Sequence, residues 1–209
     1  MNRISVKRFS FNKESIAGLR SSNPRMSKVR GVCAVITKAL MRLDRAKHGR
    51  SRDCVITQAV NMRERTTPPL PRHACGNLVL LSLARCSAPG EGEGVADVLG
   101  DATSKAVSDC AEILGLEEDR RNESAGRAFM SGEEIVLSFT DYSKFGWYGV
   151  DLGWGKPVWA SIAPHATANT VVLMGSRDGD GIEAWVHLEK NNMRLFEEDD
   201  EIARFCGLG

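Results

Sequence analysis

The sequence predicts an α/β fold with a mixed β-sheet. Segments that alternate apolar and polar residues, as strands do, interleave with segments whose apolar residues recur every three or four positions, as on one face of a helix. Late in the chain, the turn sequence RDGDG at 177–181 joins two strand-like segments as a hairpin. Interleaving favours parallel strands and a hairpin makes an antiparallel pair, so both kinds of pairing are expected.

The first elements are a strand, a short helix and a long helix. Ile4–Phe11 alternates as a strand does, and a short helix is expected near Lys13–Leu19. Ser27 is a good N-cap for the long helix, and Gly49 ends it after a basic last turn. One face of this helix is apolar: Val29, Val32, Cys33, Ile36, Leu40 and Leu43.

The remaining elements follow the same two patterns. A second helical stripe runs from Val95 to Ile113 and is closed by Gly115. The highly charged stretch 117–132 has no clear periodicity, and no element is assigned to it. An amphipathic helix is expected near Glu198–Cys206, with the acidic run before it as its solvated start. Strands are expected over 54–62, 76–83, 135–140, 158–163, 170–175 and 182–188.

The length of the chain fits one large domain or two small ones, and residues 1–209 are taken as a single domain. The chain is 42% hydrophobic and 26% charged with a net charge of +1, so no nucleic acid or membrane partner is expected. No apolar run is long enough to span a bilayer, and the N-terminus lacks a secretory pattern. The six cysteines form no CxxC pair, which favours free thiols in a reducing cytoplasm and no metal site.

The chain lacks residues that phosphate-binding and calcium-binding motifs require. In GWGK at 153–156, a Walker loop would need glycine at Val150 and a hydroxyl residue at Pro157. Asp178 and Asp180 lack the further ligands of a calcium loop, so a plain turn is the better interpretation.

No general base is recognisable. A His-x-x-x-Asp motif would let an imidazole take a proton from a substrate. The residues four positions after the histidines are not aspartates: His48 is followed by Arg52, His73 by Asn77, His165 by Asn169 and His187 by Asn191. The histidines are therefore interpreted as structural or solvent-facing, and no catalytic residue is expected in this chain.

The stretch VDLGWGKPVW at 150–159 is interpreted as a structural latch. Gly153 and Gly155 allow backbone angles closed to other residues, and Trp154 offers a large apolar wedge. Asp151 between Val150 and Leu152 is expected to turn inward, where it would need a charged partner. Three loop arginines, Arg63, Arg65 and Arg72, would suit either an anionic ligand or such a carboxylate.

These segments resemble the plant BAHD acyltransferases, which transfer acyl groups from coenzyme A to alcohols or amines. VDLGWG resembles the DFGWG signature of that family, with Leu152 in place of phenylalanine. Family-like blocks in family order also include RFSF, AVITKALMR, QAVNMRER, CGNLVLLSL, LSFTDYSKFGWYGVD and DGDGIEAWVHLEKNNMRLFEED. The resemblance covers nearly the whole chain.

The resemblance implies the C-terminal half of a two-domain, chloramphenicol acetyltransferase-like fold, without the N-terminal half that carries HxxxD. It implies that Asp151, Gly153, Trp154 and Gly155 are structural and that Asp151 pairs with Arg63. It implies no permanently bound cofactor, acyl-CoA as co-substrate, and contacts to it through Thr140 and Lys144, the latter where many members carry arginine.

Two functional hypotheses stay open at this point. The chain is an acyltransferase half that is inactive until another half supplies the base, or a non-catalytic remnant that acts as an interaction or CoA-binding module. Its partners would be acyl-CoA and a small alcohol or amine. An exposed domain interface would also favour self-association.

Overall fold

The computed structural model describes residues 3–21, 23–66, 68, 70–71, 73–87, 94–110, 116–164 and 167–208. It divides into two compact units, one formed by Met1–Leu43 and Phe139–Gly209 and the other by Asp44–Ser138. The chain passes between the units within helix α2 (Lys28–His48) and within strand β4 (Ile135–Tyr142). No helix in the described ranges is both long and apolar enough to cross a membrane.

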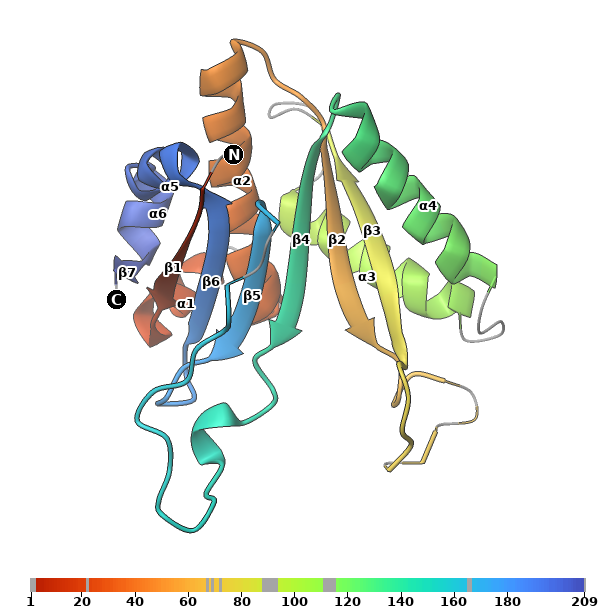
Figure 1. The fold of residues 1–209 in the computed structure, drawn as a ribbon, viewed down its shortest axis with the longest axis vertical. Coiled ribbons are helices and arrows are strands. Elements are labelled where there is room, and N and C mark those ends of the chain that lie inside the picture. The colour runs from red at the N-terminus through yellow and green to blue at the C-terminus, as the bar shows by residue number, and fades with distance from the viewer. Residues whose placement is uncertain are drawn as a thin grey trace. The chain divides into compact units, whose positions relative to one another are not determined.

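The first unit contains an antiparallel set of strands in the order β5-β6-β1-β7 (Figure 1). These are β1 (Ile4–Phe11), β5 (Thr170–Gly175), β6 (Ile182–Glu189) and β7 (Gly207–Leu208). In the β1–β6 register, Arg8 lies opposite Trp185 and Ser10 opposite Glu183. The helices are α1 (Lys13–Leu19), α2, α5 (Lys190–Glu197) and α6 (Asp200–Phe205).

Both faces of the central strand β6 are buried, for different reasons. Helix α5 packs on β1 and β6, and its Phe196 meets Phe9 edge-on with 5.1 Å between ring centroids. On the other face, Val172, Met174 and Trp185 are covered by Tyr142 at the end of β4 and by Ala160 and Ile162 from the segment between β4 and β5. That segment therefore serves as the second layer of this unit.

Helix α2 has the expected ends. The Ser27 hydroxyl accepts a hydrogen bond from the Arg30 amide at 3.2 Å, and Gly49, at φ 69°, donates to the Arg45 carbonyl at 2.9 Å. Its predicted apolar face is buried at Val32, Cys33, Ile36 and Leu40.

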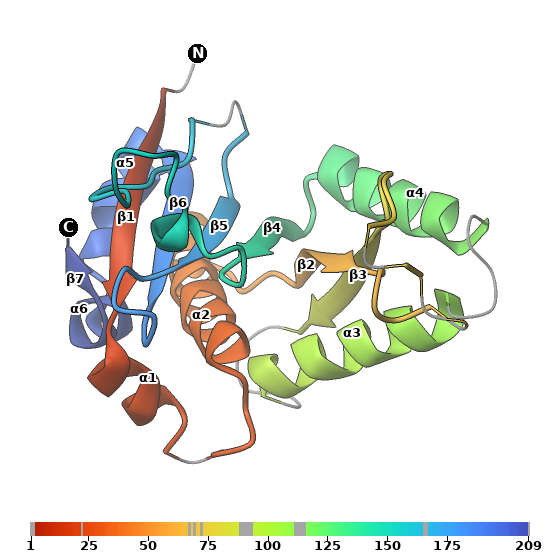
Figure 2. The ribbon, with the colours of Figure 1, turned by 90° about the horizontal axis from the view of Figure 1, so that it is seen from below.

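The second unit contains β2 (Cys54–Asn61), β3 (Val79–Cys86) and the start of β4, with α3 (Val95–Cys110) and α4 (Leu116–Ser131). β2 and β3 are antiparallel, whereas β2 and β4 point the same way in Figure 1. Figure 2 shows α3 and α4 alongside β3, and both helices contact this strand. A core cluster of Val60, Met62, Leu80 and Ala106 joins β2, β3 and α3.

The predicted fold class, α/β with a mixed sheet, is confirmed. The elements expected at 4–11, 13–19, 54–62, 135–140, 170–175 and 182–188 are present within one or two residues at each end. The strand expected at 76–83 runs instead over Val79–Cys86, and the helix expected to reach Ile113 is described to Cys110, since 111–115 lie outside the described residues.

One predicted element is wrong, and two observed helices were not predicted. Residues 158–163 form no strand, because Ala160 and Ile162 alternate inward onto the β5–β6 face without a neighbouring strand to pair with. The charged stretch 117–132, for which no element was predicted, lies in α4 as far as Ser131, and Arg127 pairs there with Glu123 one turn earlier. Helix α5 was missed, because its buried face consists of only Met193 and Phe196.

The acidic run before α6 is not simply solvated. Asp199 caps α6 by accepting from the Glu201 and Ile202 amides, and its carboxylate makes a two-point contact with Arg42 of α2 at 2.8 Å. Although burial acts in the opposite direction, the Arg42 and helix-amide hydrogen bonds hold the pKa of Asp199 below its usual value.

Candidate functional site

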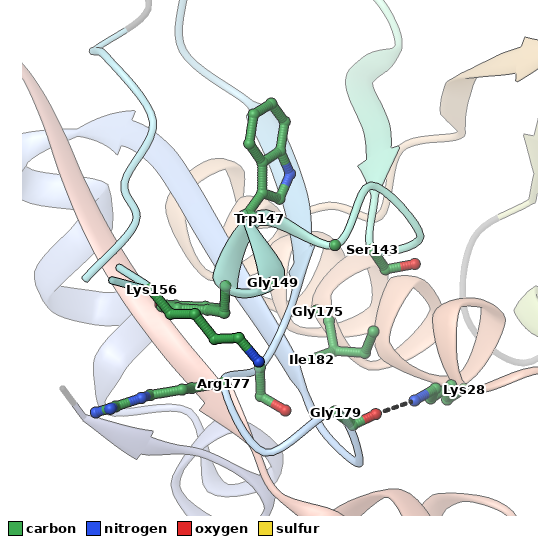
Figure 3. A pocket seen from close by; sticks show the side chains of 12 residues that line it. Lys28, Ser143, Trp147, Gly149, Lys156, Gly175, Arg177, Gly179 and Ile182 are labelled. Atoms are coloured by element: carbon green, nitrogen blue, oxygen red, sulfur yellow. Dashed lines mark hydrogen bonds between the residues drawn. The ribbon is translucent and has the colours of Figure 1, made fainter. Parts of the chain in front are cut away.

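A pocket of about 310 Å³ lies within the first unit, where four segments meet (Figure 3). It is lined by Lys28 at the start of α2, by the turn 143–149 after β4, by Lys156, and by the β5–β6 hairpin. Its volume is in the range of small-ligand sites.

The turn after β4 is held tightly against β5. Asp141 accepts a hydrogen bond from the Ser143 amide at 2.8 Å, and Gly146, at φ 63°, leads into the short helix η1 (Trp147–Gly149). A Cβ atom placed on Gly175 would lie 2.7 Å from the Ser143 carbonyl oxygen. Glycine at 175 therefore permits the close approach that forms this wall of the pocket.

The hairpin that forms the opposite wall is stabilised by its own polar groups. Asp178 contacts the Ser176 hydroxyl and accepts from the Asp180 amide at 3.1 Å. The Ser176 hydroxyl is the main cause of the lowered pKa of Asp178. The hairpin turn predicted at RDGDG is present, with the Gly179 amide donating to the Ser176 carbonyl at 3.0 Å. The described residues hold no group of three or more possible metal ligands.

The pocket is electropositive. Three of its lining side chains are cationic, Lys28, Lys156 and Arg177, and none of its described lining residues is acidic. The Lys28 ammonium donates to the carbonyls of Gly179 and Asp180 at 3.1 and 3.4 Å, which fixes it at the rim. In Figure 3 the Lys156 ammonium reaches toward the middle of the pocket. Such a site favours a ligand with several negative charges.

The buried carboxylate of Glu183 lies next to η1, which forms part of the pocket wall. Tyr148 of η1 donates its hydroxyl to Glu183 of β6, with 3.1 Å to Oε2 and 3.3 Å to Oε1. Glu183 is buried, and Arg8 of β1 lies 3.3 Å from its Oε1. Burial raises the pKa of Glu183, although Tyr148 and Arg8 act in the opposite direction.

The structure corrects the expectation that Asp151 turns inward. Its side chain is exposed, and Oδ1 accepts hydrogen bonds from the Gly153 and Gly155 amides at 2.8 and 3.1 Å. The conformational need for the glycines is confirmed, with φ 104° and 103°. Trp154 is 84% exposed, so it is not a wedge within this chain.

Arg63 and the two residues predicted to contact the coenzyme, Thr140 and Lys144, do not line the pocket. Arg63, in the second unit, donates to the carbonyls of Ala74 and Gly76 at 3.4 and 2.8 Å. Thr140 is half-buried on β4 and Lys144 is exposed in the turn, and neither lines the pocket. The pairing of Asp151 with Arg63 stays a prediction, and Arg72 lies outside the described residues.

Sequence reasoning missed the residues that make the pocket cationic. Lys156 was considered only as part of a Walker loop, and nothing in the local sequence connects it to Lys28 or Arg177, which are 128 and 21 residues away. Of the histidines, His187 is fully buried in β6 and His48 contacts Asp44 at the end of α2, which favours the structural interpretation. His165 lies outside the described residues.

Comparison with known proteins gives consistent matches. Residues 6–203 match the model of the Transferase family. The chain is 44% identical over 214 residues to pelargonidin 3-O-(6-caffeoylglucoside) 5-O-(6-O-malonylglucoside) 4'''-malonyltransferase of Salvia splendens, covering 97% of this chain and 51% of that protein. It is 34% identical to vinorine synthase of Rauvolfia serpentina, covering 92% and 46%.

Solved structures show the same relation. The crystal structure of vinorine synthase superimposes with a TM-score of 0.76 at 32% identity, over 100% of this chain and 49% of that one. TRI101 of F. sporotrichioides, complexed with coenzyme A and T-2, gives a TM-score of 0.64 at 18% identity, over 100% and 52%. The chain thus spans about half the length of the relatives it matches.

Proposed function

This chain belongs to the Transferase family, that of the plant BAHD acyltransferases its motifs resemble, and we propose that its electropositive pocket binds the phosphate groups of acyl-CoA. The observation that carries the proposal is that Lys28, Lys156 and Arg177 all line one pocket, with no acidic lining residue among those described. A solved relative in complex with coenzyme A supports the choice of ligand.

The chemistry of the pocket matches that ligand. Coenzyme A carries a diphosphate and a 3′-phosphate, and ammonium and guanidinium groups bind phosphate oxygens by charge-assisted hydrogen bonds. Lys28 also stands in the first turn of a 21-residue helix, whose amide end adds positive potential. Trp147 and Ile182 give the pocket an apolar portion suited to the uncharged parts of the coenzyme.

Acyl transfer needs a further group that this sequence does not contain. A base must take the proton of the acceptor hydroxyl or amine while its oxygen or nitrogen attacks the thioester carbonyl carbon. The resulting tetrahedral intermediate then expels coenzyme A thiolate. Because no histidine here is followed by aspartate four positions on, we infer that a second half with the HxxxD motif supplies this base. The role of this chain is to bind and orient the acyl donor.

The segment 145–159 is the proposed contact surface for that second half. Seven of the nine exposed large hydrophobic side chains in the described residues lie within it: Phe145, Trp147, Val150, Leu152, Trp154, Val158 and Trp159. Exposed apolar side chains gathered in one segment are typical of an interface. The Asp151–Arg63 pair that the family resemblance implies belongs to this proposal, and without a partner the same surface would favour self-association.

The second candidate is a coenzyme A-binding module without turnover. It is favoured by one observation, an anion pocket in a chain that lacks a recognisable base. Transfer from acetyl-CoA to a panel of alcohols separates the candidates. The module hypothesis predicts no turnover under any conditions, whereas the acyltransferase-half hypothesis predicts turnover once the N-terminal half of a relative is added.

Binding of free coenzyme A tests the pocket itself. Lys156→Gln should raise the Kd at least about five-fold, because it removes one charge from the pocket. Lys38→Gln, on an exposed position of α2 outside the pocket, is the matched control and should leave the Kd unchanged. If instead Lys144→Gln weakens binding and Lys156→Gln does not, the coenzyme binds where the family resemblance implied and the pocket proposal fails.

A further inference from the structure

The segment between β4 and β5 covers the sheet as an extended layer, but its described residues do not pair with any strand. Residues 150–164 form no helix or strand, yet Ala160 and Ile162 pack on the β5–β6 face. Much of the same segment is exposed to solvent, with Val158 75% and Trp159 52% exposed. Segments with few backbone hydrogen bonds and a thin apolar contact are easily displaced, so the contacts that fix this one determine the shape of the pocket wall.

The first fixed point is a polar cluster of Tyr148, Glu183 and Arg8. The Tyr148 hydroxyl contacts both oxygens of Glu183, and Arg8 reaches one of them from β1. The Glu183 side chain is 6% exposed and that of Arg8 19%. Because Ser10 lies opposite Glu183 and Arg8 opposite Trp185, Arg8 and Glu183 are diagonal neighbours on the same face of the sheet.

The second fixed point uses the same arginine. The Arg8 guanidinium lies 4.2 Å from the centroid of the Trp159 ring, which meets Trp185 edge-on at 5.9 Å and 83°. Arg8 thus holds the segment at Trp159 directly and at Tyr148 through Glu183. Lys156 lies between these two points in the sequence, and Tyr148 itself lines the pocket.

We propose that Tyr148, Glu183 and Arg8 are positioning residues that fix residues 147–159 on the sheet and hold Lys156 over the pocket. The inference rests on the proposed function of the pocket as a phosphate site. An unanchored segment would spread the Lys156 ammonium over many positions, and ordering it on binding would cost affinity.

Tyr148→Phe tests the proposal with a matched control. The chain has just two tyrosines, and the hydroxyl of the other, Tyr142, has no hydrogen-bond partner among the described residues, so Tyr142→Phe removes the same atom without touching the cluster. Two properties are measured for the 209-residue chain: hydrogen–deuterium exchange of 147–159, and the Kd for coenzyme A by tryptophan fluorescence. Tyr148→Phe should speed exchange about ten-fold and raise the Kd about five-fold, while Tyr142→Phe should change neither.

A second variant guards against loss of folding. Arg8→Lys keeps the charge near Glu183 but loses the planar group over Trp159, so exchange should rise most at 156–159. If exchange and Kd in both variants equal those of the wild type, the positioning role is overturned. If the wild-type chain does not bind coenzyme A, the proposed function fails, and exchange alone decides: faster exchange supports the anchoring and unchanged exchange refutes it.

Discussion

Gly175→Ala should damage the pocket wall by the addition of a single methyl group. The new Cβ would lie 2.7 Å from the Ser143 carbonyl oxygen, and the atom it meets belongs to the backbone. Ordinary carbon–oxygen contacts are about 3.3 Å or longer, so the turn after β4 must move away from β5 by roughly half an ångström. Overpacking of this kind costs about 1–3 kcal/mol, which corresponds to a fall in Tm of about 2–12 °C for a chain of this size.

The assay is thermal unfolding followed by circular dichroism, with urea unfolding as a second measurement. Gly126→Ala is the control, because this glycine lies within α4 and a Cβ atom added there would meet no side chain or neighbouring segment within 4 Å. The control should stabilise the chain by about 0.5–1 kcal/mol, the usual gain of alanine over glycine in a helix. If Gly175→Ala unfolds at the wild-type temperature, the close approach of the turn to β5 is not present in solution.

Three further predictions follow from the first unit. Phe196→Ala should cost about 3–5 kcal/mol, because its ring is fully buried against Phe9; an unchanged urea midpoint would contradict this packing. Asp151→Ala should change the free energy of unfolding of this chain by no more than about 1 kcal/mol, because the substitution removes an exposed carboxylate that caps its own loop and breaks no buried ion pair. A larger loss of stability would indicate that Asp151 has a buried partner after all. Asp199 has a lowered pKa, so its stabilising contribution is present above the unfolded pKa and disappears as pH falls through the lower folded value. The stability difference between wild type and Asp199→Asn, measured by urea unfolding, should therefore shrink below about pH 3.8, and a difference that stays constant to about pH 2 would refute the linkage.

Much of the fold was predictable because local patterns coincide with tertiary burial. The long helix was found from Ser27, Gly49 and one apolar stripe, all of which act within a few residues of the chain. The same local reasoning failed at 158–163, where alternation arises from packing onto a sheet face rather than from pairing in a ladder. Pattern alone does not distinguish these two causes.

The pocket was not predictable from local sequence, because its charges come from distant segments. Lys28, Lys156 and Arg177 line the same pocket only through the packing of α2, the covering segment and the β5–β6 hairpin. Asp151 shows a second limit of reasoning from local sequence. Its apolar neighbours along the chain suggested that it is buried, whereas the loop that it caps is exposed in this chain. A sequence pattern reports which residues neighbour an acid along the chain, not what covers it in space.

An experimental structure of the chain soaked with coenzyme A tests the central claim most directly. We predict phosphate oxygens within hydrogen-bonding distance of the Lys156 ammonium, in the pocket between η1 and the β5–β6 hairpin. Coenzyme bound beside Lys144 with this pocket vacant would contradict the assignment, and so would a structure in which millimolar coenzyme A leaves no bound molecule.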